Sequence, residues 1–306
     1  MVECFLDSSS LVNRSKAMVN RMLVDPHMHT SVGSPDSNIS PQELILKAKR
    51  RGIEVLCLTD HNSYRGFKKA RQIGQKEGVL VIRGIELDTK HGHVLVYGAD
   101  MSEFLEVNKG ILIREIESCR KMRVEELREI FFSVVPSFEV DTLINTAHAK
   151  SGAVVLPHPF GQQYPEHKTM RYYLDHYLAE ISSKHSNEAQ LIEIDIEQLI
   201  TFIQSRDPML FAFLKNVDGI EVLNPSCSWA ENQAAFALAD YLDKKKIGGS
   251  DAHAPEEVGL CVTVFASNSN IRCERDFIDY LKGNSNLEPR VNLVRDRLTH
   301  LSVRQK

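Results

Sequence analysis

The chain has 306 residues, of which 42% are hydrophobic and 25% are charged. These values are close to those of soluble globular proteins, so they exclude a disordered chain, a collagen-like fibre and a membrane-embedded protein. The formal net charge is −4. Capture of duplex DNA by a general excess of basic residues is therefore not expected.

The six cysteines are scattered and include no C-x-x-C pair, so the sequence indicates neither a zinc knuckle nor a disulfide framework. Cys57 and Cys261 lie in apolar runs and are expected to be core thiols. No stretch approaches the ~20 apolar residues of a membrane span. Residues 1–21, an expected N-terminal extension, lack the apolar core of a signal peptide, which favours a cytoplasmic protein.

Apolar runs of strand length alternate with helical patterns along the chain. In chain order, we expect strands at 22–25, 53–58, 79–87, 93–98, 153–159, 219–223, the start of 247–253, and 262–265. Helices are expected from Ser40-Pro41 to Gly52, and at 65–77, 111–131, 139–150, 230–244 and 275–283. Ser40 suits an N-cap and Pro41 the first helical turn.

About seven such units predict an α/β fold, and we favour a parallel barrel over an open sheet. The barrel domain is expected to span residues 22–285, followed by a C-terminal tail at 286–306. The segment 162–216 is too long for one unit and is largely helical in pattern, so we expect a helical insertion against the barrel. Its loops are expected at 162–165 and 182–188.

Side chains that bind metals stand near the predicted strand ends. His27 and His29 are two residues apart on an extended chain and point the same way, and Asp251 and His253 repeat this spacing. Other strand ends carry Asp60-His61, Glu86, His93 and His158. The carboxyl ends of parallel strands meet on one face of a barrel, where active sites are built.

A single H-x-H pair is as easily read as two unconnected polar residues near a turn. The full set is harder to explain in that way, because a buried cluster of uncompensated charge is costly. Imidazole and carboxylate ligands without thiolate suit manganese, zinc or iron. The sequence therefore predicts a site for divalent cations.

The sequence resembles the PHP family of phosphoesterases, named for polymerase and histidinol phosphatase. The motifs that carry the resemblance span about residues 22–285 in the order of the family: DPHMHT (25–30), PDSNISPQEL (35–44), LTDHNSYRG (58–66), GIELDT (84–89), GHVLVYG (92–98), LPHPFG (156–161), VDGIEVLN (217–224) and GGSDAHAPEEVG (248–259).

The resemblance implies a distorted (β/α)7 TIM-like barrel with a trinuclear metal site. It assigns His27, His29 and Asp251 to the first ion, His93 and His158 to the second, Asp36, His61 and His253 to the third, with Glu86 bridging the first two. Glu86, Asp251 and His253 are the expected catalytic residues among them. Asp36 lies seven residues after His29, a longer gap than in many members of the family.

Charge arithmetic is compatible with a phosphate substrate. Three divalent cations and three carboxylates leave about +3 in the inner site, which attracts a phosphate dianion. A water activated by the ions is the expected nucleophile, so no serine or cysteine nucleophile is required.

Several polar residues lie next to the expected ligands in the sequence, and two of them have two possible roles. Asp25 and Asp60 either orient imidazoles or cap turns. His91 is expected at the surface, and His148 is expected to be structural in a helix. The histidines of the insertion are expected to be solvated: His167, His176 and His185.

Three residues are candidates for substrate binding. Asn224 ends a predicted strand and is expected to line the pocket. Lys168 and Arg171 follow His158 and either contact a second phosphate or belong to a solvated helix face.

The predicted function is hydrolysis of phosphate monoesters with two to three divalent ions. Nucleotides are the expected substrates, such as nucleoside 3′,5′-bisphosphates or short oligonucleotide ends, because 217–224 and 248–259 resemble that subgroup. Histidinol-phosphate phosphatase is the first alternative, and a non-catalytic metal-stabilised binding module is the alternative of another class.

Overall fold

A computed structural model of the chain describes residues 21–106, 139–161, 168–184, 194–266 and 271–293. The helix expected at 111–131, the loop at 162–165, most of the loop at 182–188, His167 and His185 lie outside these residues. The division of the chain into extension, barrel domain and tail stays a prediction.

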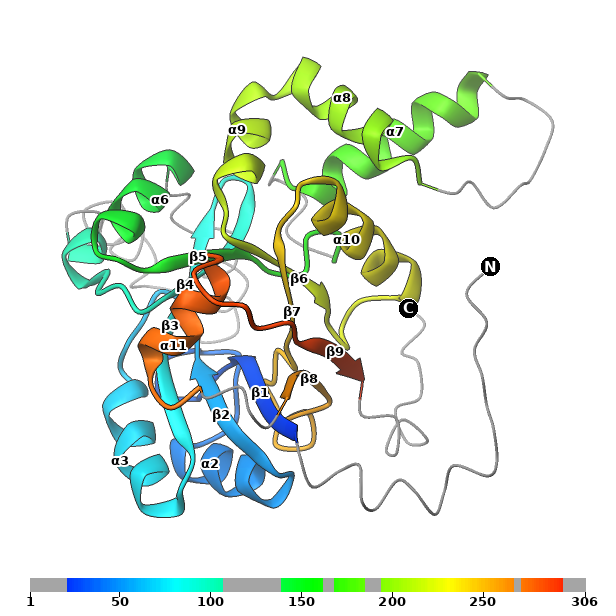
Figure 1. The fold of residues 1–306 in the computed structure, drawn as a ribbon. Helices are drawn as coiled ribbons and strands as arrows, with labels where there is room; N and C mark the ends of the chain where they lie inside the picture. Colours follow the sequence, from blue (N-terminus) through cyan, green and yellow to red (C-terminus); the bar gives the residue numbers. More distant parts are fainter. Residues whose placement is uncertain (1–20, 107–138, 162–167, 185–193, 267–270, 294–306) are drawn as a thin grey trace, which may run out of the picture.

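The described strands form one sheet of nine in the order β7-β6-β5-β4-β3-β2-β1-β8-β9. Their bounds are β1 Arg21–Met28, β2 Ile53–Leu58, β3 Leu80–Thr89, β4 Gly92–Tyr97, β5 Ala153–Leu156, β6 Gly219–Leu223, β7 Lys245–Gly248, β8 Cys261–Ala266 and β9 Arg290–Leu293. The pairs β1–β2, β2–β3, β5–β6 and β6–β7 are parallel. Figure 1 shows these strands beside the helices that cover them.

Three strands depart from the parallel arrangement that we favoured for the barrel. Strand β4 is antiparallel to both β3 and β5, and β8 is antiparallel to β1 and β9. Only Lys90 and His91 separate β3 from β4, and a parallel crossover needs a dozen or more residues. Strand β9 lies within the predicted C-terminal tail, and its pairing with β8 makes it an edge of the sheet.

The sheet curls until its two halves meet, which confirms a barrel-like fold. The amide of Asp251, after β7, donates to the carbonyl of His27 on β1 over 2.9 Å, and His29 N donates to Ala252 O over 3.1 Å. Thr263 Oγ1 on β8 accepts from the amide of Gly248 on β7 over 2.9 Å. This near closure brings the end of β7 to the end of β1.

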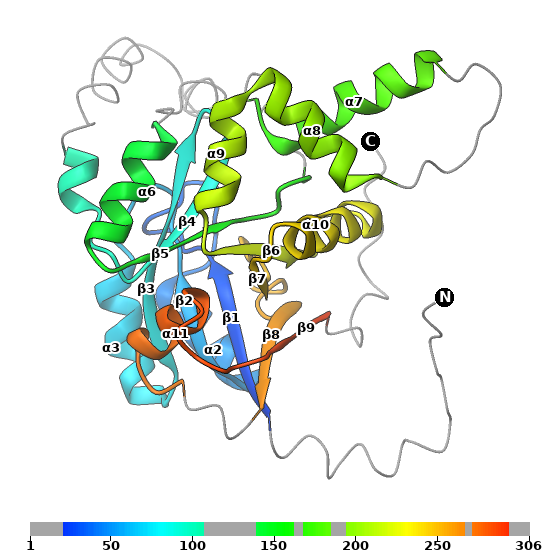
Figure 2. The same cartoon turned by 45° about the horizontal axis from the view of Figure 1, so that its top comes forward.

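The helices lie outside the sheet or at its open end (Figures 1 and 2). Their bounds are α2 Pro41–Arg50, α3 Phe67–Glu77, α6 Val140–Ala149, α7 Met170–Lys184, α8 Ile196–Arg206, α9 Pro208–Asn216, α10 Trp229–Tyr241 and α11 Glu274–Leu281. Ser40 caps α2 as expected, its Oγ accepting from the amide of Glu43 over 3.2 Å. Cys57 and Cys261 are buried, as expected of core thiols.

The insertion 162–216 contributes α7, α8 and α9, which confirms its helical pattern. Leu199 and Ile203 of α8 and Phe213 of α9 are fully buried in one cluster with Ile220 of β6 and Leu238 of α10. The insertion is therefore packed on the barrel by its apolar faces. Among the described helices, none is long and apolar enough to span a membrane.

Candidate metal centre

The predicted ligands lie where the strand ends of the barrel meet. His27 is on β1, Glu86 on β3 and His93 on β4, while His158 and Asp251 lie two and three residues past the ends of β5 and β7. His158 and Asp251 both have positive φ, 25° and 50°. Such conformations are uncommon for residues with a side chain and cluster at functional sites, where the surroundings hold them.

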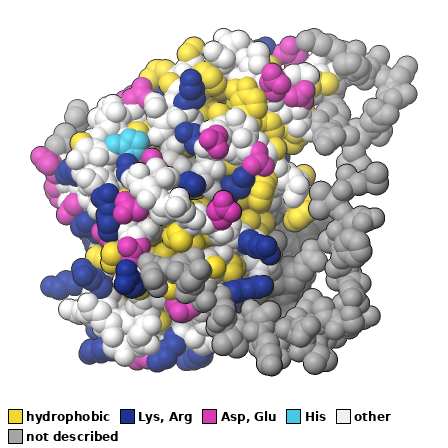
Figure 3. Space-filling model, in the orientation of Figure 1, with side chains coloured by type: hydrophobic (Ala, Val, Ile, Leu, Met, Phe, Trp, Pro, Cys, Tyr) yellow, Lys and Arg dark blue, Asp and Glu magenta, His cyan; other side chains and the backbone are white. Residues whose placement is uncertain are grey.

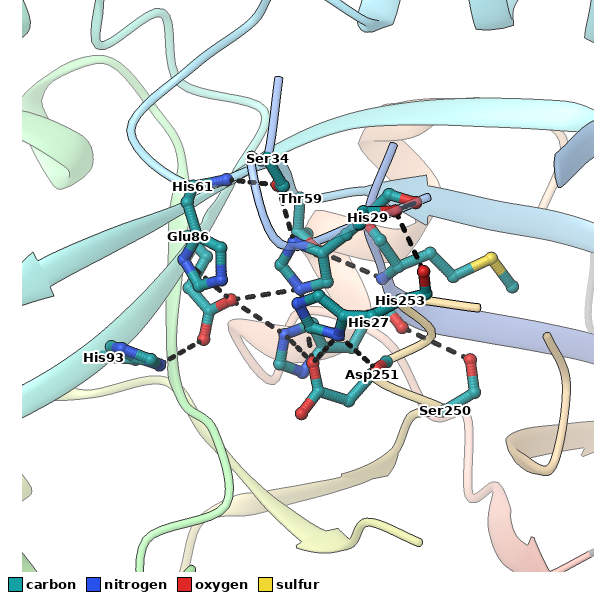
Figure 4. Close-up of polar contacts among 12 residues, drawn as sticks. His27, His29, Ser34, Thr59, His61, Glu86, His93, Ser250, Asp251 and His253 are labelled. Atoms are coloured by element: carbon teal, nitrogen blue, oxygen red, sulfur yellow. Dashed lines mark hydrogen bonds and ion pairs between the residues drawn. The ribbon is translucent and has the colours of Figure 1, made fainter. Parts of the chain in front are cut away.

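Glu86 lies at the centre of the cluster, and its two oxygens face different imidazoles (Figure 4). Its Oε2 is 3.1 Å from Nε2 of both His27 and His29, and its Oε1 is 2.9 Å from His93 Nδ1 and 3.4 Å from His158 Nε2. This carboxylate is 1% exposed. One side chain thus joins two groups of potential ligands.

Asp251 completes the group around His27 and His29. Its Oδ1 is 3.3 Å from Nε2 of each imidazole. The candidate ligand atoms of His27, His29, Glu86 and Asp251 all lie within 4.8 Å of one another. These four side chains have the proximity that a single cation requires.

A third group forms around Asp36. Its Oδ2 is 3.3 Å from His253 Nε2 and 3.6 Å from His61 Nε2. The His29 and His253 rings are stacked with centroids 4.2 Å apart, so this group adjoins the first. The longer gap between His29 and Asp36 has not separated Asp36 from the cluster.

Hydrogen bonds at the outer ring nitrogens orient the imidazoles. His27 Nδ1 is 3.1 Å from Glu221, His29 Nδ1 is 3.0 Å from Ser34 Oγ, and His253 Nδ1 is 2.8 Å from the Asp251 carbonyl. With its proton on Nδ1, each neutral imidazole would present the lone pair of Nε2 toward the carboxylates. Such outer contacts set the tautomer and aim of metal-binding histidines.

Glu221 is a functional residue that the sequence analysis missed. It lies on β6, 1% exposed, and its Oε2 accepts from the amide of His158 over 3.0 Å and from Asn224 Nδ2 over 2.9 Å. A Cβ at Gly249 would come within 2.6 Å of Glu221 Oε1, so glycine is needed beside it. A glutamate inside the apolar strand GIEVL was the available signal.

Asp88 was missed as well. Its Oδ1 is 3.1 Å from His93 Nε2, and its Oδ2 accepts from the side-chain Nδ2 of Asn62. His93 is therefore held between Asp88 and Glu86. The alternation of Glu86 and Asp88 on one face of β3 could have indicated this role.

Asp25 and Asp60 contact backbone and hydroxyl groups rather than imidazoles. Asp25 accepts from the amides of Ser250 and Gly259, both over 3.0 Å, and its burial raises its pKa to about 7. Asp60 accepts from the amide of Thr30 over 2.6 Å. Of the two readings, capping of the turns is the one the contacts support.

The three substrate candidates have different surroundings. Asn224 is fully buried and donates to Glu221 and, over 3.3 Å, to Asp251 Oδ2, so it orients acidic groups of the cluster. Arg171 is paired with Asp175 and Glu231. Lys168 has an exposed side chain. Contacts of these residues with substrate stay predictions.

The expectation that His91 lies at the surface is wrong. His91 is 5% exposed, and its Nδ1 is 3.2 Å from the carbonyl of Lys168 and 3.8 Å from Asp207 Oδ2. The β3–β4 hairpin thus lies under the insertion, whose packing the local sequence does not reveal. His148 is in α6 and bonds Asp218 over 2.9 Å, and His176 is exposed, both as expected.

Comparison of the sequence with models of protein families assigns the chain to a family. The model of the PHP domain matches residues 25–202, and that of the PHP-associated region matches residues 229–285. The chain belongs to the PHP-domain family. The resemblance inferred from the motifs is thereby confirmed.

The relatives of this PHP domain share only part of their length with it. An uncharacterized protein of Methanocaldococcus jannaschii is 34% identical over 83 residues, 24% of this chain and 48% of that protein. A 3′,5′-nucleoside bisphosphate phosphatase of Chromobacterium violaceum is 27% identical over 111 residues, 35% of this chain and 36% of that enzyme. The chain thus covers about half or less of these relatives.

A solved structure supports the barrel fold of this PHP domain over most of the chain. PsfC from Pseudomonas syringae matches with a TM-score of 0.52 at 18% identity, covering 90% of this chain and 93% of that one. At this identity the likeness shows the fold alone.

The side chains of this PHP domain fit divalent cations. Buried His29 Nε2, His253 Nε2 and Glu86 Oε1 make no well-directed hydrogen bond within the described residues. Polar atoms buried in this way are costly unless they bind something. The family is metal-dependent, and the clusters present here can hold metal ions.

In the PHP cluster, buried imidazoles and carboxylates shift one another's pKa values. Burial opposes a charge on His29, but the carboxylates of Asp251 and Glu86 outweigh burial and raise the pKa of His29 to about 9. Burial likewise opposes a charge on Glu86, yet imidazoles such as that of His27 hold its pKa well below the usual range. By contrast, burial lowers the pKa of His61 to about 4.

Proposed function

We propose that this PHP domain is a metal-dependent hydrolase that cleaves phosphate monoesters, with nucleotides as substrates. The observation that carries the proposal is the position of Glu86, whose two oxygens face two separate groups of imidazoles. A carboxylate in this position is suited to bridging two cations, and paired cations suit the displacement at a phosphate.

Nine residues would hold the ions. The proposed sets are His27, His29 and Asp251; His93 and His158; and Asp36, His61 and His253, with Glu86 shared by the first two sets. Manganese, zinc and iron are the ions that this donor set favours. When bound, two to three such ions would stabilise charge on the phosphate oxygens and lower the pKa of an attacking water.

Protein groups outside the ligand set would hold this arrangement in place. Glu221 orients His27 through Nδ1, and Asn224 ties Glu221 to Asp251. Since these contacts are buried or partly buried, they would pre-position the ligands before substrate arrives, which lowers the cost of assembling the transition state.

Nucleotide substrates are supported by the relatives and by position in the fold. One relative is named for nucleoside 3′,5′-bisphosphates. Lys168 precedes α7, its carbonyl lies 3.2 Å from His91 Nδ1 on the β3–β4 hairpin, and its side chain is exposed, so it is the candidate for a second phosphate. Arg171 is a weaker candidate because Asp175 and Glu231 already neutralise it.

The test is release of phosphate by purified protein loaded with manganese, zinc or iron. We expect a nucleoside 3′,5′-bisphosphate to show a higher kcat/KM than the monophosphate or histidinol phosphate. A tenfold preference corresponds to about 1.4 kcal/mol, within reach of one charge-assisted hydrogen bond. Lys168→Ala should shrink this preference and leave the monophosphate rate nearly unchanged.

Two results would change the assignment. If histidinol phosphate is hydrolysed faster, the assigned substrate changes from a nucleotide to histidinol phosphate. The assignment as a phosphatase then still holds. If the metal-loaded protein cleaves no phosphate ester, the enzyme reading is wrong and the metal-stabilised binding module takes its place.

A further inference from the structure

Trp229 is the single tryptophan of the chain, and 65% of its surface is exposed. Among the described residues it is the most exposed of the large hydrophobic side chains, ahead of Tyr241 at 49%. An indole left in water loses the hydrophobic stabilisation that its large surface would give in a core. A role outside folding would account for this position.

Neither helix capping nor core packing requires the indole. The start of α10 is closed by a capping box, in which Ser228 Oγ accepts from the amide of Glu231 over 3.3 Å and Glu231 Oε2 accepts from the amide of Ser228 over 2.7 Å. The buried side of the helix consists of other residues, including Ala235 and Leu238. Many residues would serve at position 229 if stability alone decided it.

Contacts near the start of α10 tie this helix to the metal centre. Asn232 Oδ1 accepts from the amide of Asn224 over 2.9 Å, and Asn232 Nδ2 donates to the carbonyl of Asn224 over 3.1 Å. Asn224 in turn reaches Asp251 over 3.3 Å. Trp229 is three residues before Asn232, so it shares that side of the helix and leans toward the helix N-terminus, near the loop from Asn224.

Other contacts bring the second ligand loop to the same place. A Cβ at Gly161 would lie 3.0 Å from Cys227 Sγ, so the segment after His158 adjoins the loop before α10. Figure 1 shows α10 beginning where β6 ends. Figure 3 shows basic and acidic side chains mixed over one face of the molecule, so no single sign of charge dominates that face. Trp229, the first residue of α10, therefore presents an exposed indole close to the loops that follow β5 and β6.

We propose that Trp229 is a specificity-determining residue, on which the nucleobase of the substrate stacks while the phosphate enters the metal centre. The inference rests on the proposed function and names the part of the chain that recognises the base. Stacking of a base on an aromatic ring accepts any base, because every base has a π-face. The residue would thus favour nucleotides over sugar phosphates without selecting one nucleotide.

The kinetic test compares substrates that differ only by the base. Adenosine 5′-monophosphate and ribose 5-phosphate carry the same phosphate on the same sugar carbon. We expect Trp229→Ala to lower kcat/KM about tenfold for the nucleotide, in the range of one stacked base, and less than about twofold for ribose 5-phosphate. Trp229→Phe should retain most of the nucleotide activity. Tyr241→Ala, at the other end of α10, is the matched control and should change neither substrate.

Equal losses on both substrates in Trp229→Ala, or no loss on either, would overturn the proposal. So would conversion of an oligomer to monomers by Trp229→Ala in sedimentation, because Trp229 would then belong to a subunit interface. Circular dichroism of the variant establishes that it is folded, and Trp229→Phe provides the comparison if it is not.

A second readout does not depend on turnover. Because the chain has one tryptophan, fluorescence excited selectively at tryptophan reports on Trp229 alone. We expect adenosine 5′-monophosphate to quench the fluorescence of the metal-loaded protein and ribose 5-phosphate to leave it unchanged. Hydrolysis without quenching would refute the stacking alone, whereas quenching without hydrolysis of any phosphate ester would refute the proposed function and leave the base site standing.

Discussion

At the scale of single residues, Glu86 is the side chain on which the proposed activity depends most. Its two oxygens face different groups of imidazoles. We expect Glu86→Gln to lower kcat at least about 100-fold, the scale of removing one electrostatic stabiliser. His61→Ala should have an effect of similar size. The measurement is phosphate release with saturating metal, and His176→Ala, exposed on α7, is the control.

Near-normal turnover of metal-saturated Glu86→Gln would contradict the bridging role. If a higher metal concentration fully restores the kcat of Glu86→Gln, Glu86 contributes to metal affinity alone.

Glu221 acts one contact farther out, through His27 Nδ1. We expect Glu221→Gln to weaken metal binding about 10–100-fold, as is typical when a hydrogen-bond partner of a ligand is changed. The measurement is a competition titration against a chelator of known affinity. Glu197→Gln, on α8, is the control, and unchanged affinity in Glu221→Gln would show that His27 holds its orientation without the carboxylate.

At the scale of elements, His91 connects the β3–β4 hairpin to the insertion. Its ring bonds the carbonyl of Lys168 and lies near Asp207, which caps α9 through a 2.9 Å bond from the amide of Leu210. We expect His91→Ala to lower the free energy of unfolding by about 1–3 kcal/mol, since the buried imidazole and its partly buried hydrogen bond to the Lys168 carbonyl are both lost.

Urea denaturation of the metal-free protein measures this loss, with exposed His176→Ala as the control. Because His93 follows in the same hairpin, His91→Ala should also weaken metal binding. Unchanged stability together with unchanged metal affinity would mean that the insertion and the hairpin are held by apolar packing alone.

For the molecule as a whole, metal and proton binding oppose each other. In the metal-free protein the raised pKa of His29, about 9 against 6.5, contributes stability that is present below pH 6.5 and is lost as the pH rises through 9. Metal requires the deprotonated imidazole, so metal affinity should increase over the same interval.

We therefore expect the difference in Tm between metal-loaded and chelator-treated protein to grow between pH 6 and pH 9. At a free metal concentration of 100 times Kd, each site adds about 2.7 kcal/mol to the free energy of unfolding. Calorimetry in buffers of different ionisation enthalpy would detect the released protons. A metal effect independent of pH would show that the ligands are already deprotonated in the metal-free protein.

The sequence by itself determined the local features of this protein. The alternation of apolar runs and helical patterns, the Ser40 cap and the ligand pairs at His27/His29 and Asp251/His253 depend on neighbouring residues, and a single sequence displays them. The nine candidate ligands and the PHP motifs were recognisable for the same reason.

Only the tertiary structure decided which distant segments meet. Strand β4 reverses because two residues cannot make a crossover, and the end of β7 meets β1 because the sheet curls. Glu221 lies 194 positions from the His27 ring that it orients, and buried His91 contacts Lys168 and Asp207 of the insertion. Burial and contact between such segments arise from packing of the whole chain, which no periodicity in the sequence records.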